Sequence, residues 1–364
     1  MLPLILKIKQ QLETDPTLNP EYPPPLGIPE FSRRAVELAL GKESRAIVEN
    51  RVLGVQTVGI SGALRLGAEL IRNCYCLNSS WPGSVFLPSP CDESLPAIFK
   101  AAGIGDVQHY RYWNNINRCV CIKEMEEDLD KAPDQSLVVL SASGHFPTGA
   151  DLLQEEWKRV TEVMVRRRLL PFFLLPAQGL CSRDMEQDSW ILRYCVSLGM
   201  ELLCAQSFSH NFSLYGERVA HLLFVLKENG SLLAVQSQAE KIVRTLWSRP
   251  PSGGARLVAT VLSNPAHLVE WQGALRGAGE RCMLMRERLR DKLRLLGSPG
   301  PWDHLIKSGG LYCCIGLTVE QVNFLLKRMH IYLLPEGCLN VSAINSDNLD
   351  YVAESIHLAL TSQQ

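Results

Sequence analysis

Residues 205–221 read AQSFSHNFSLYGERVAH, and they overlap the end of an apolar run, ELLCAQS at 201–207, that predicts a buried strand. Ser207 and Ser209 come at the end of this run, and Arg218 follows nine residues after Ser209. Two hydroxyl groups and a guanidinium at this spacing are suited to hold a phosphate, in an arrangement where a lysine often stands at the position of His210. An equally open alternative is that the serines cap a turn and that Arg218 is a surface side chain.

A second turn has similar chemistry. Gly59-Ile-Ser-Gly62 precedes the amphipathic segment ALRLGAELIR at 63–72, which predicts a helix. Glycines let a backbone approach an anion closely, the start of a helix offers free N–H groups, and Ser61 adds a hydroxyl. The pattern is weak by itself, because glycine between a strand and a helix is common. Together with Ser207 and Arg218, it predicts two turns that converge on one phosphate at the carboxyl ends of strands.

The order of apolar and amphipathic segments predicts an α/β fold. The expected strands are 84–88, 136–143, 169–176 and 201–207, and the expected helices include 151–168 and 186–199. A long charged helix at 264–297 leads into a Gly/Pro stretch, SPGPW, and then into a C-terminal part with its own short apolar runs. We therefore expect a large domain at 1–275 and a smaller α/β domain at 276–364.

Composition excludes several classes of protein. The 364 residues carry a net charge of −1 with no long run of either sign, which argues against a nucleic-acid surface. No apolar run is long enough to span a bilayer, and MLPLILKIKQQLETDP reads as a first helix rather than a signal peptide, so we expect a cytosolic protein. The 12 cysteines form no CxxC pair and read as small apolar residues, so we expect no metal.

No P-loop, HExxH or Ser-His-Asp arrangement is present. His145, in the turn SGHFPTG, is a candidate acid or base. The more common outcome for such a residue is a partly exposed histidine without a catalytic role.

The chain nevertheless resembles a known family along most of its length. It is similar to aspartate aminotransferase, a class I enzyme that depends on pyridoxal 5′-phosphate (PLP), and most similar to the divergent aspartate aminotransferase-like paralogue of the cytosolic enzyme. The segments that carry the resemblance are NPEYPPPLGIPEF, ENRVLGVQTVGISGALRLGAE, YRYWN, FPTGADLLQEEWKRV, CAQSFSHNFSLYGER, EKIVRTLWSRPPSGGARLVATVLSNP and HIYLLPEG.

The resemblance implies fold type I, with a mixed, mostly parallel seven-stranded sheet in the large domain and a homodimer whose active sites lie at the subunit interface. Ser207 and Arg218 fall where the family binds the PLP phosphate, and Ser61 falls at the hydroxyl of its phosphate loop. Tyr22 matches the tyrosine that reaches the neighbouring subunit's phosphate, and Arg244 matches the arginine lent to the neighbouring subunit to bind the substrate's distal carboxylate.

The departures from the family pattern concern the chemistry itself. His210 stands where the family has the lysine that forms a Schiff base with PLP, and an imidazole cannot supply the primary amine. The family's amino-terminal arm and a small-domain segment have no counterpart. By the same resemblance, Leu174 replaces the aspartate that pairs with the pyridine nitrogen, and Ala177 replaces a tyrosine at the phenolic oxygen. Phe146 replaces an asparagine, Asp92 replaces the stacking tryptophan, and Cys338 replaces the arginine that binds the α-carboxylate.

These losses concern four separate functions: covalent attachment, ring electronics, ring stacking and substrate anchoring. The sequence therefore predicts an aspartate aminotransferase-like protein that is catalytically degenerate, with PLP implied by the family but not covalently attached. Two alternatives stay open. One is an active L-aspartate:2-oxoglutarate aminotransferase; the other is a non-catalytic protein that binds a phosphate or dicarboxylate, or that pairs with the active enzyme in a mixed dimer.

Overall fold

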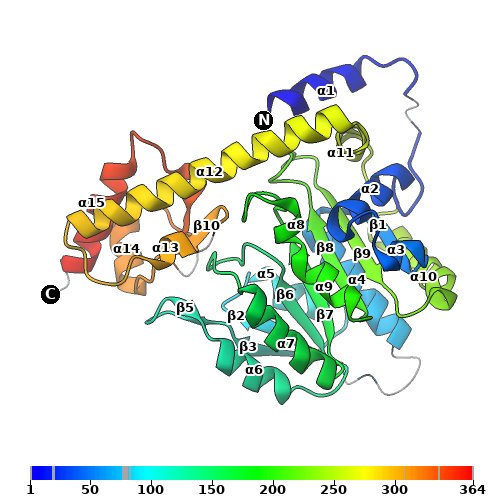
Figure 1. Cartoon of the computed structure of the whole chain (residues 1–364), viewed down its shortest axis with the longest axis horizontal. Helices are drawn as coiled ribbons and strands as arrows, with labels where there is room; N and C mark the ends of the chain where they lie inside the picture. Colours follow the sequence, from blue (N-terminus) through cyan, green and yellow to red (C-terminus); the bar gives the residue numbers. More distant parts are fainter. Residues whose placement is uncertain are drawn as a thin grey trace.

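The computed structural model describes residues 2–18, 21–75, 81, 83–307, 309–334 and 337–362, and its centre is a seven-stranded sheet (Figure 1). In spatial order the strands are β1 (Val52–Val58), β9 (Val219–Val225), β8 (Leu202–Ser207), β7 (Leu170–Leu175), β6 (Leu137–Ser141), β2 (Ser84–Ser89) and β3 (Asp106–Arg111). Only β9 pairs antiparallel with its neighbours; the other pairs are parallel. The predicted α/β fold with a mixed, mostly parallel sheet is confirmed.

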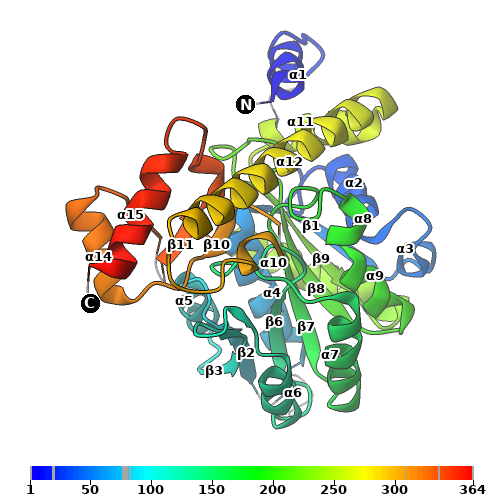
Figure 2. The ribbon, with the colours of Figure 1, turned by 60° about the vertical axis from the view of Figure 1, so that its left-hand side comes forward.

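Helices cover both faces of this sheet, because its strands are apolar on both sides (Figure 2). In β6, Leu137 and Val139 belong to one core cluster, whereas Val138 and Leu140 belong to the other. The helices on the first side are α4 (Gly59–Tyr75), α5 (Ser94–Ala101) and α10 (Leu232–Leu246). Those on the second side are α2 (Pro29–Leu40), α3 (Arg45–Val48), α6 (Ile122–Asp130), α7 (Gln154–Arg166) and α9 (Trp190–Ser197).

The predicted first helix, α1 (Pro3–Glu13), packs onto the body of the protein. Its buried residues Leu4, Ile5 and Ile8 join a core cluster with α11 (Gly253–Ser263) and with Trp271 at the start of α12 (Pro265–Leu295). Figure 1 shows α1 lying beside the end of α12 that is nearest to the sheet. The amphipathic start of the chain therefore forms part of the globular structure.

The second half of α12 belongs to another core. Cys282 and Leu289 pack there with Trp302, Leu325 and Ile356. The elements that surround this core are α13 (His304–Lys307), β10 (Tyr312–Cys314), α14 (Val319–Arg328), β11 (Cys338–Asn340) and α15 (Leu349–Thr361). The domain boundary that we propose, between residues 275 and 276, lies within α12; Leu275 contributes to the core shared with α1, whereas Cys282 contributes to the second core.

A buried charge organises the second of these parts. The side chain of Arg286, on α12, is almost fully buried and donates hydrogen bonds to backbone oxygens of the segment 305–312. The acceptors are the carbonyls of Leu305 at 2.9 Å, Gly309 at 3.0 Å, Gly310 at 3.2 Å and Tyr312 at 2.5 Å. Because buried carbonyl groups need a donor, this guanidinium fixes the course of the segment between α13 and β10.

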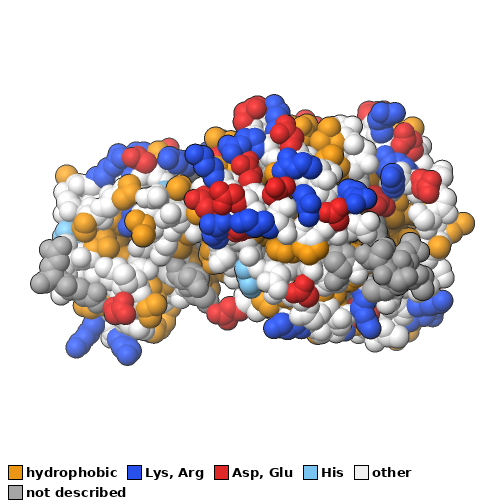
Figure 3. All heavy atoms as spheres, turned by 90° about the horizontal axis from the view of Figure 1, so that it is seen from below, with side chains coloured by type: hydrophobic (Ala, Val, Ile, Leu, Met, Phe, Trp, Pro, Cys, Tyr) orange, Lys and Arg blue, Asp and Glu red, His pale blue; other side chains and the backbone are white. Residues whose placement is uncertain are grey.

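On the face seen in Figure 3, acidic and basic side chains are interspersed. In the described part of the chain, no helix combines the length and the apolar composition required to cross a membrane. The described cysteines are free thiols, and most of them are buried or half-buried, as expected for apolar filling.

Replacing Arg286 with methionine should destabilise the protein by about 3 kcal/mol, because several buried carbonyls lose their donor at once. The free energy of unfolding, measured by urea denaturation, checks this. Arg288 lies on the same helix but is exposed, so Arg288→Met is the matched control and should change stability by less than about 0.5 kcal/mol. Equal effects of the two substitutions would contradict the role assigned to Arg286.

Candidate active site

The pairing of strands β1, β9 and β8 brings together three residues that the sequence singles out. Val58, the last residue of β1, pairs with Val219, and Ser207, the last residue of β8, pairs with Ala220. Because β9 runs in the opposite direction, its first residues lie at the edge where β1 and β8 end. Gly59, Ser207 and Arg218 therefore meet at this edge, where the N–H of Gly59 donates to the carbonyl of Arg218 at 2.6 Å.

The guanidinium of Arg218 lies directly against the start of α4. A Cβ added to Gly59 would lie 2.5 Å from Nη2 of Arg218, and the φ of Gly59 is +70°, so only glycine fits here without displacing the arginine. Ser61 is exposed in the same helical turn, and no carboxylate in the described residues forms an ion pair with Arg218. Ser207 is buried, and its hydroxyl accepts the N–H of Ser209 at 3.3 Å. The two predicted turns thus lie side by side.

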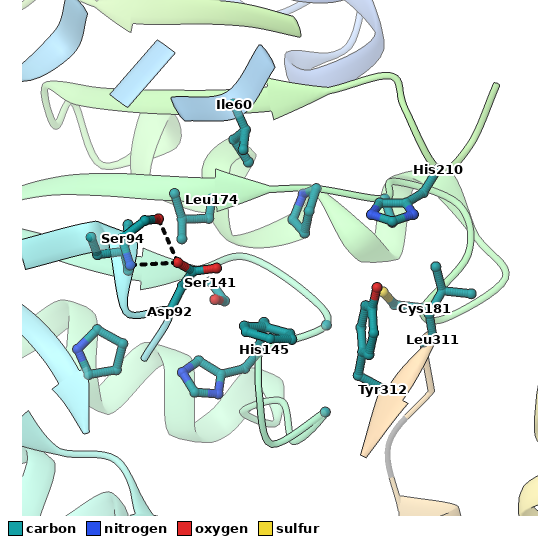
Figure 4. A pocket seen from close by; sticks show the side chains of 18 of the residues that line it. Ile60, Asp92, Ser94, Ser141, His145, Leu174, Cys181, His210, Leu311 and Tyr312 are labelled. Atoms are coloured by element: carbon teal, nitrogen blue, oxygen red, sulfur yellow. Dashed lines mark hydrogen bonds between the residues drawn. The ribbon is translucent and has the colours of Figure 1, made fainter. Parts of the chain in front are cut away.

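A cavity of about 360 Å³ opens at the same edge of the sheet (Figure 4). Its lining comes from the starts of α4 and α5, the ends of β2, β6 and β7, the turns after β6 and β8, and two segments of the C-terminal part. The lining residues are Ile60, Ser61, Leu64, Pro88, Asp92, Ser94, Leu95, Ile98, Ser141, Gly144, His145, Phe146, Gly149, Leu174, Pro176, Ala177, Cys181, His210, Gly309, Gly310, Leu311, Tyr312 and Leu334.

His210 lies at one end of this cavity and is half-buried. Its ring centre is 5.4 Å from that of Tyr215 and 6.4 Å from that of Tyr312, with both pairs close to edge-to-face. Burial lowers the pKa of His210, because the imidazolium loses hydration. The neutral ring is therefore favoured at neutral pH, and it can accept a proton but offers no primary amine.

The positions at which the resemblance implies departures from the family pattern lie in two kinds of surroundings. Leu174, Ala177 and Phe146 line the cavity with apolar atoms, and Figure 4 shows Leu174 pointing into it. Asp92 is exposed, and its carboxylate accepts the N–H of Ser94 at 2.8 Å and its hydroxyl at 2.5 Å. This carboxylate binds the first residue of α5, so Asp92 has a local structural role and offers no aromatic surface for stacking.

His145 is not the partly exposed turn residue that its setting suggests. The side chain is almost fully buried, its Nδ1 lies 2.8 Å from the hydroxyl of Thr148, and its ring centre is 4.0 Å from that of Tyr112. Burial lowers the pKa of His145 to about 3. The backbone N–H of His145 donates to Asp151 at 3.2 Å, and burial raises the pKa of that carboxyl to about 7. His145 therefore lines the cavity as a neutral ring.

Ser207, Ser209 and Arg218 lie at the same edge of the sheet but outside the lining of this cavity. Cys338, Tyr22 and Arg244 also lie outside that lining. Cys338 is buried in β11 opposite Cys314, and burial raises the pKa of its thiol, so a neutral group occupies this position. Tyr22 is 79% exposed, and the guanidinium of Arg249 lies 5.8 Å from its ring centre. Arg244 is exposed near the end of α10. Tyr22 and Arg244 do not serve the cavity of their own chain.

The segment Gly309–Tyr312 lines the cavity but is not recognised by the sequence analysis. It comes from beyond α12 and is held there by Arg286. Gly149 lies against it so closely that an added Cβ would be 2.0 Å from the carbonyl oxygen of Tyr312. No local pattern indicates this contact, because it joins residues more than 150 positions apart. A pair of adjacent glycines, Gly309 and Gly310, is the only signal in the sequence.

Comparison with known proteins places this architecture among the aminotransferases. The family model described as "Aminotransferase class I and II" matches residues 3–356. The cytoplasmic aspartate aminotransferase of Gallus gallus is 44% identical over 364 residues, which is 100% of this chain and 88% of that protein.

Two solved structures have the same fold. The aspartate aminotransferase of Trypanosoma cruzi is 32% identical, with a TM-score of 0.90 over 99% of this chain and 88% of that chain. The aromatic-amino-acid aminotransferase of Burkholderia pseudomallei, solved covalently bound to pyridoxal phosphate, is 32% identical, with a TM-score of 0.91 and the same coverage.

The approach of Gly149 to Tyr312 predicts a strong effect of a single methyl group. Gly149→Ala should destabilise the protein by about 3 kcal/mol, because the new Cβ meets a backbone oxygen that is itself held by Arg286. Gly199 has a similar positive φ, but its added Cβ would meet no atom within 4 Å. Gly199→Ala should therefore destabilise the protein by only about 1 kcal/mol, which is the cost of placing alanine at a positive φ. Thermal and urea denaturation of both variants would show the difference, and equal losses would contradict it.

Proposed function

Because the chain belongs to the class I and II aminotransferase family, we propose that it is an aspartate aminotransferase-like protein that performs no covalent PLP chemistry. One observation carries this proposal: none of the described residues that line the cavity is a lysine. The side chain that follows β8 is the imidazole of His210. An imidazole has no primary amine and therefore cannot form a stable imine with an aldehyde. The ligand class that best fits the family is a small dicarboxylic amino acid or oxo acid.

The residues present fit one end of PLP and not the other. The guanidinium of Arg218, which lies against Gly59, and the hydroxyls of Ser61 and Ser207 are suited to bind a phosphate. At the ring end, Leu174 offers no carboxylate to a pyridine nitrogen, and Phe146 and Ala177 offer no polar group. PLP, when bound to an aminotransferase, supplies an electron sink, and that property depends on protonation of the ring nitrogen. The fit therefore supports non-covalent binding at most.

Within the cavity, the chain's own residues act by binding and shaping. Beside the cavity, against Gly59, Arg218 is exposed and forms no ion pair with any described carboxylate. This favours a second candidate function, the binding of a phosphorylated or dicarboxylate metabolite without reaction. Tyr312, held through its carbonyl by Arg286, closes the cavity beside His210. A working aminotransferase would require a lysine at the cofactor, and no described lining residue meets that requirement.

Borohydride reduction tests the proposal. Purified protein mixed with PLP should yield no reduced lysine adduct in peptide mapping by mass spectrometry, and it should not convert aspartate and 2-oxoglutarate. A shift of the PLP absorbance that inorganic phosphate reverses, without an adduct, would support the non-covalent candidate. An adduct on a lysine of this cavity, together with turnover, would overturn the proposal in favour of an active aminotransferase.

His210→Lys is the informative variant in the same experiment. It restores a primary amine, so we expect PLP to become attached at residue 210. Transaminase activity should stay at least about a thousandfold below that of an active family member, because Leu174, Asp92 and Cys338 still lack the groups for ring electronics, stacking and carboxylate binding. Substantial turnover from this single change would show that the other replacements matter little.

The exposed positions of Tyr22 and Arg244 bear on assembly. We propose a homodimer in the cytoplasm, as in the family, with these two side chains directed to the neighbouring subunit rather than to their own cavity. Co-expression with an active aspartate aminotransferase tests the related mixed-dimer hypothesis: a stable heterodimer should show about half of the activity per dimer. Recovery of homodimers only would rule the mixed dimer out, and a monomer in light scattering would contradict both.

A further inference from the structure

Two cysteines lie opposite each other in the small sheet of the C-terminal part, where β10 and β11 run side by side (Figure 2). Cys314 in β10 pairs with Cys338 in β11 in antiparallel register, and both are free thiols that are almost fully buried. The N–H of Cys314 donates to the carbonyl of Thr148 at 3.0 Å, and its carbonyl oxygen lies 3.1 Å from Nε2 of His304. The carbonyl of Cys338 accepts the N–H of Leu334 at 3.0 Å. The backbone groups of both cysteines thus point away from each other.

The register of the ladder gives this pair the spacing of a disulfide. The N–H of Val341 donates to the carbonyl of Leu311 at 2.7 Å, and hydrogen-bonded and non-hydrogen-bonded pairs alternate along an antiparallel ladder. Cys314 and Cys338, three pairs further along, therefore form a non-hydrogen-bonded pair. In such pairs the Cα atoms lie about 4.5 Å apart, within the range of about 4.4–6.8 Å that a disulfide spans. The two side chains also lie on the same face of the ladder.

A third buried thiol, Cys313, lies on the opposite face. Cys313 pairs with Leu339, and both pack into the core of the C-terminal part. Because side chains alternate along a strand, Cys314 and Cys338 face the other way. Tyr312 lies on their face of β10, and its side chain lines the cavity. Cys313 is therefore a matched control: it has the same burial and an adjacent position, but the wrong side of the strand.

A cation lies near one of the two facing thiols. Arg118, which directly precedes β5 (Cys119–Val120), is buried, and its guanidinium lies 4.5 Å from the ring centre of Trp302. Burial lowers the pKa of Arg118, and attraction to Cys314 as a thiolate opposes that change. The same attraction favours the thiolate of Cys314, which is the form that attacks a disulfide. Burial raises the pKa of the Cys338 thiol, so Cys338 reacts second.

We propose that Cys314 and Cys338 are a redox-sensitive pair that a low-molecular-weight disulfide, such as oxidised glutathione, converts into a reversible intrachain disulfide. The thiolate of Cys314 attacks one sulfur of the reagent, releases one small thiolate and becomes a mixed disulfide. The sulfur of Cys338 then attacks Sγ of Cys314, and its proton leaves with the second small thiol. Two protein thiols lose two electrons, and the reagent is reduced to two thiols. Access comes from local opening of the ladder, which has only three residue pairs.

The bond would fix one wall of the cavity. Tyr312 lies two residues before Cys314, and the N–H of Leu334 donates to the carbonyl of Cys338; both Tyr312 and Leu334 line the cavity. A covalent link between β10 and β11 therefore ties two cavity-lining residues to each other. Hydrogen exchange of the Leu334 N–H should slow on oxidation, because the opening that releases this hydrogen bond also separates the strands.

Equilibration of the full-length wild-type protein with oxidised and reduced glutathione tests the proposal. After alkylation of the remaining thiols, trypsin cleaves behind Lys307, Lys327 and Arg328, so the disulfide joins peptide 308–327 to peptide 329–364. We expect mass spectrometry to show this cross-link, and excess reduced glutathione to remove it. The equilibrium constant for its formation should be at least about tenfold higher in the folded protein than in urea, because only the fold holds the two thiols opposite each other. The oxidised protein should also melt at a higher temperature.

Single substitutions identify the partner of Cys338, because peptide 308–327 contains both Cys313 and Cys314. Cys314→Ala should abolish the cross-link, whereas Cys313→Ala should form it to the same extent as the wild type. The two variants remove the same atom from neighbouring buried positions, so a general loss of packing would affect both. A melting curve shows whether each variant is folded, and the comparison of folded with unfolded wild type does not depend on any variant.

Three results would overturn the inference: no cross-link in the folded wild type, equal equilibrium constants with and without urea, or a cross-link that a folded Cys314→Ala variant retains. Unchanged exchange of the Leu334 N–H in the oxidised protein would contradict the effect on the cavity wall. The inference does not rest on the proposed function. A lysine adduct of PLP trapped by borohydride would overturn that function and leave the cysteine pair unaffected, and failure of the disulfide to form would leave the proposed function standing.

Discussion

The buried guanidinium of Arg286 is the interaction on which the candidate site depends. It donates to carbonyls of the segment 305–312 and thereby holds Gly309–Tyr312 against the carboxyl edge of the large sheet. Without that segment the strands would end at an open surface, and the cavity would lack the wall that includes Tyr312. A buried charge is costly to desolvate, so its hydrogen bonds to several carbonyls are what make this arrangement stable. The long helix α12 thus connects the folding of the C-terminal part to the shape of the site.

The second constraint is the direction of β9. In a sheet whose other strands are parallel, the one antiparallel strand starts where its neighbours end, and this places Arg218 beside Gly59 and Ser207. A phosphate-type edge and an apolar interior therefore lie next to each other but are built by different elements. The edge depends on sheet register, whereas the interior depends on side chains from β7, α4, α5 and the C-terminal part. Changes to side chains in the interior therefore leave the position of Arg218, Gly59 and Ser207 at the edge unaffected.

Burial favours the neutral forms of the titratable rings in the cavity. Desolvation keeps His145, His210 and Tyr312 in their neutral forms, and Asp92 turns its carboxylate to the backbone of α5. Catalysis in this family needs the opposite condition, charged groups held ready in a low-dielectric site. Leu174, Ala177 and Phe146 contribute only apolar side-chain atoms to the lining.

The sequence by itself determined the element types, the α/β class and the family, because these rest on local periodicity and on long collinear motifs such as GISGALRLGAE and SFSHNFSLYGER. Through the family resemblance, it also predicts replacements at His210, Leu174 and Cys338. Only the tertiary structure decided the surroundings of other residues: His145 is buried rather than partly exposed, the carboxylate of Asp92 accepts the N–H of Ser94, and Tyr312 lines the cavity. The physical reason is that burial and the hydrogen bonds of Arg286 arise from contacts between distant segments, and no local pattern of residues encodes which distant backbone a side chain will meet.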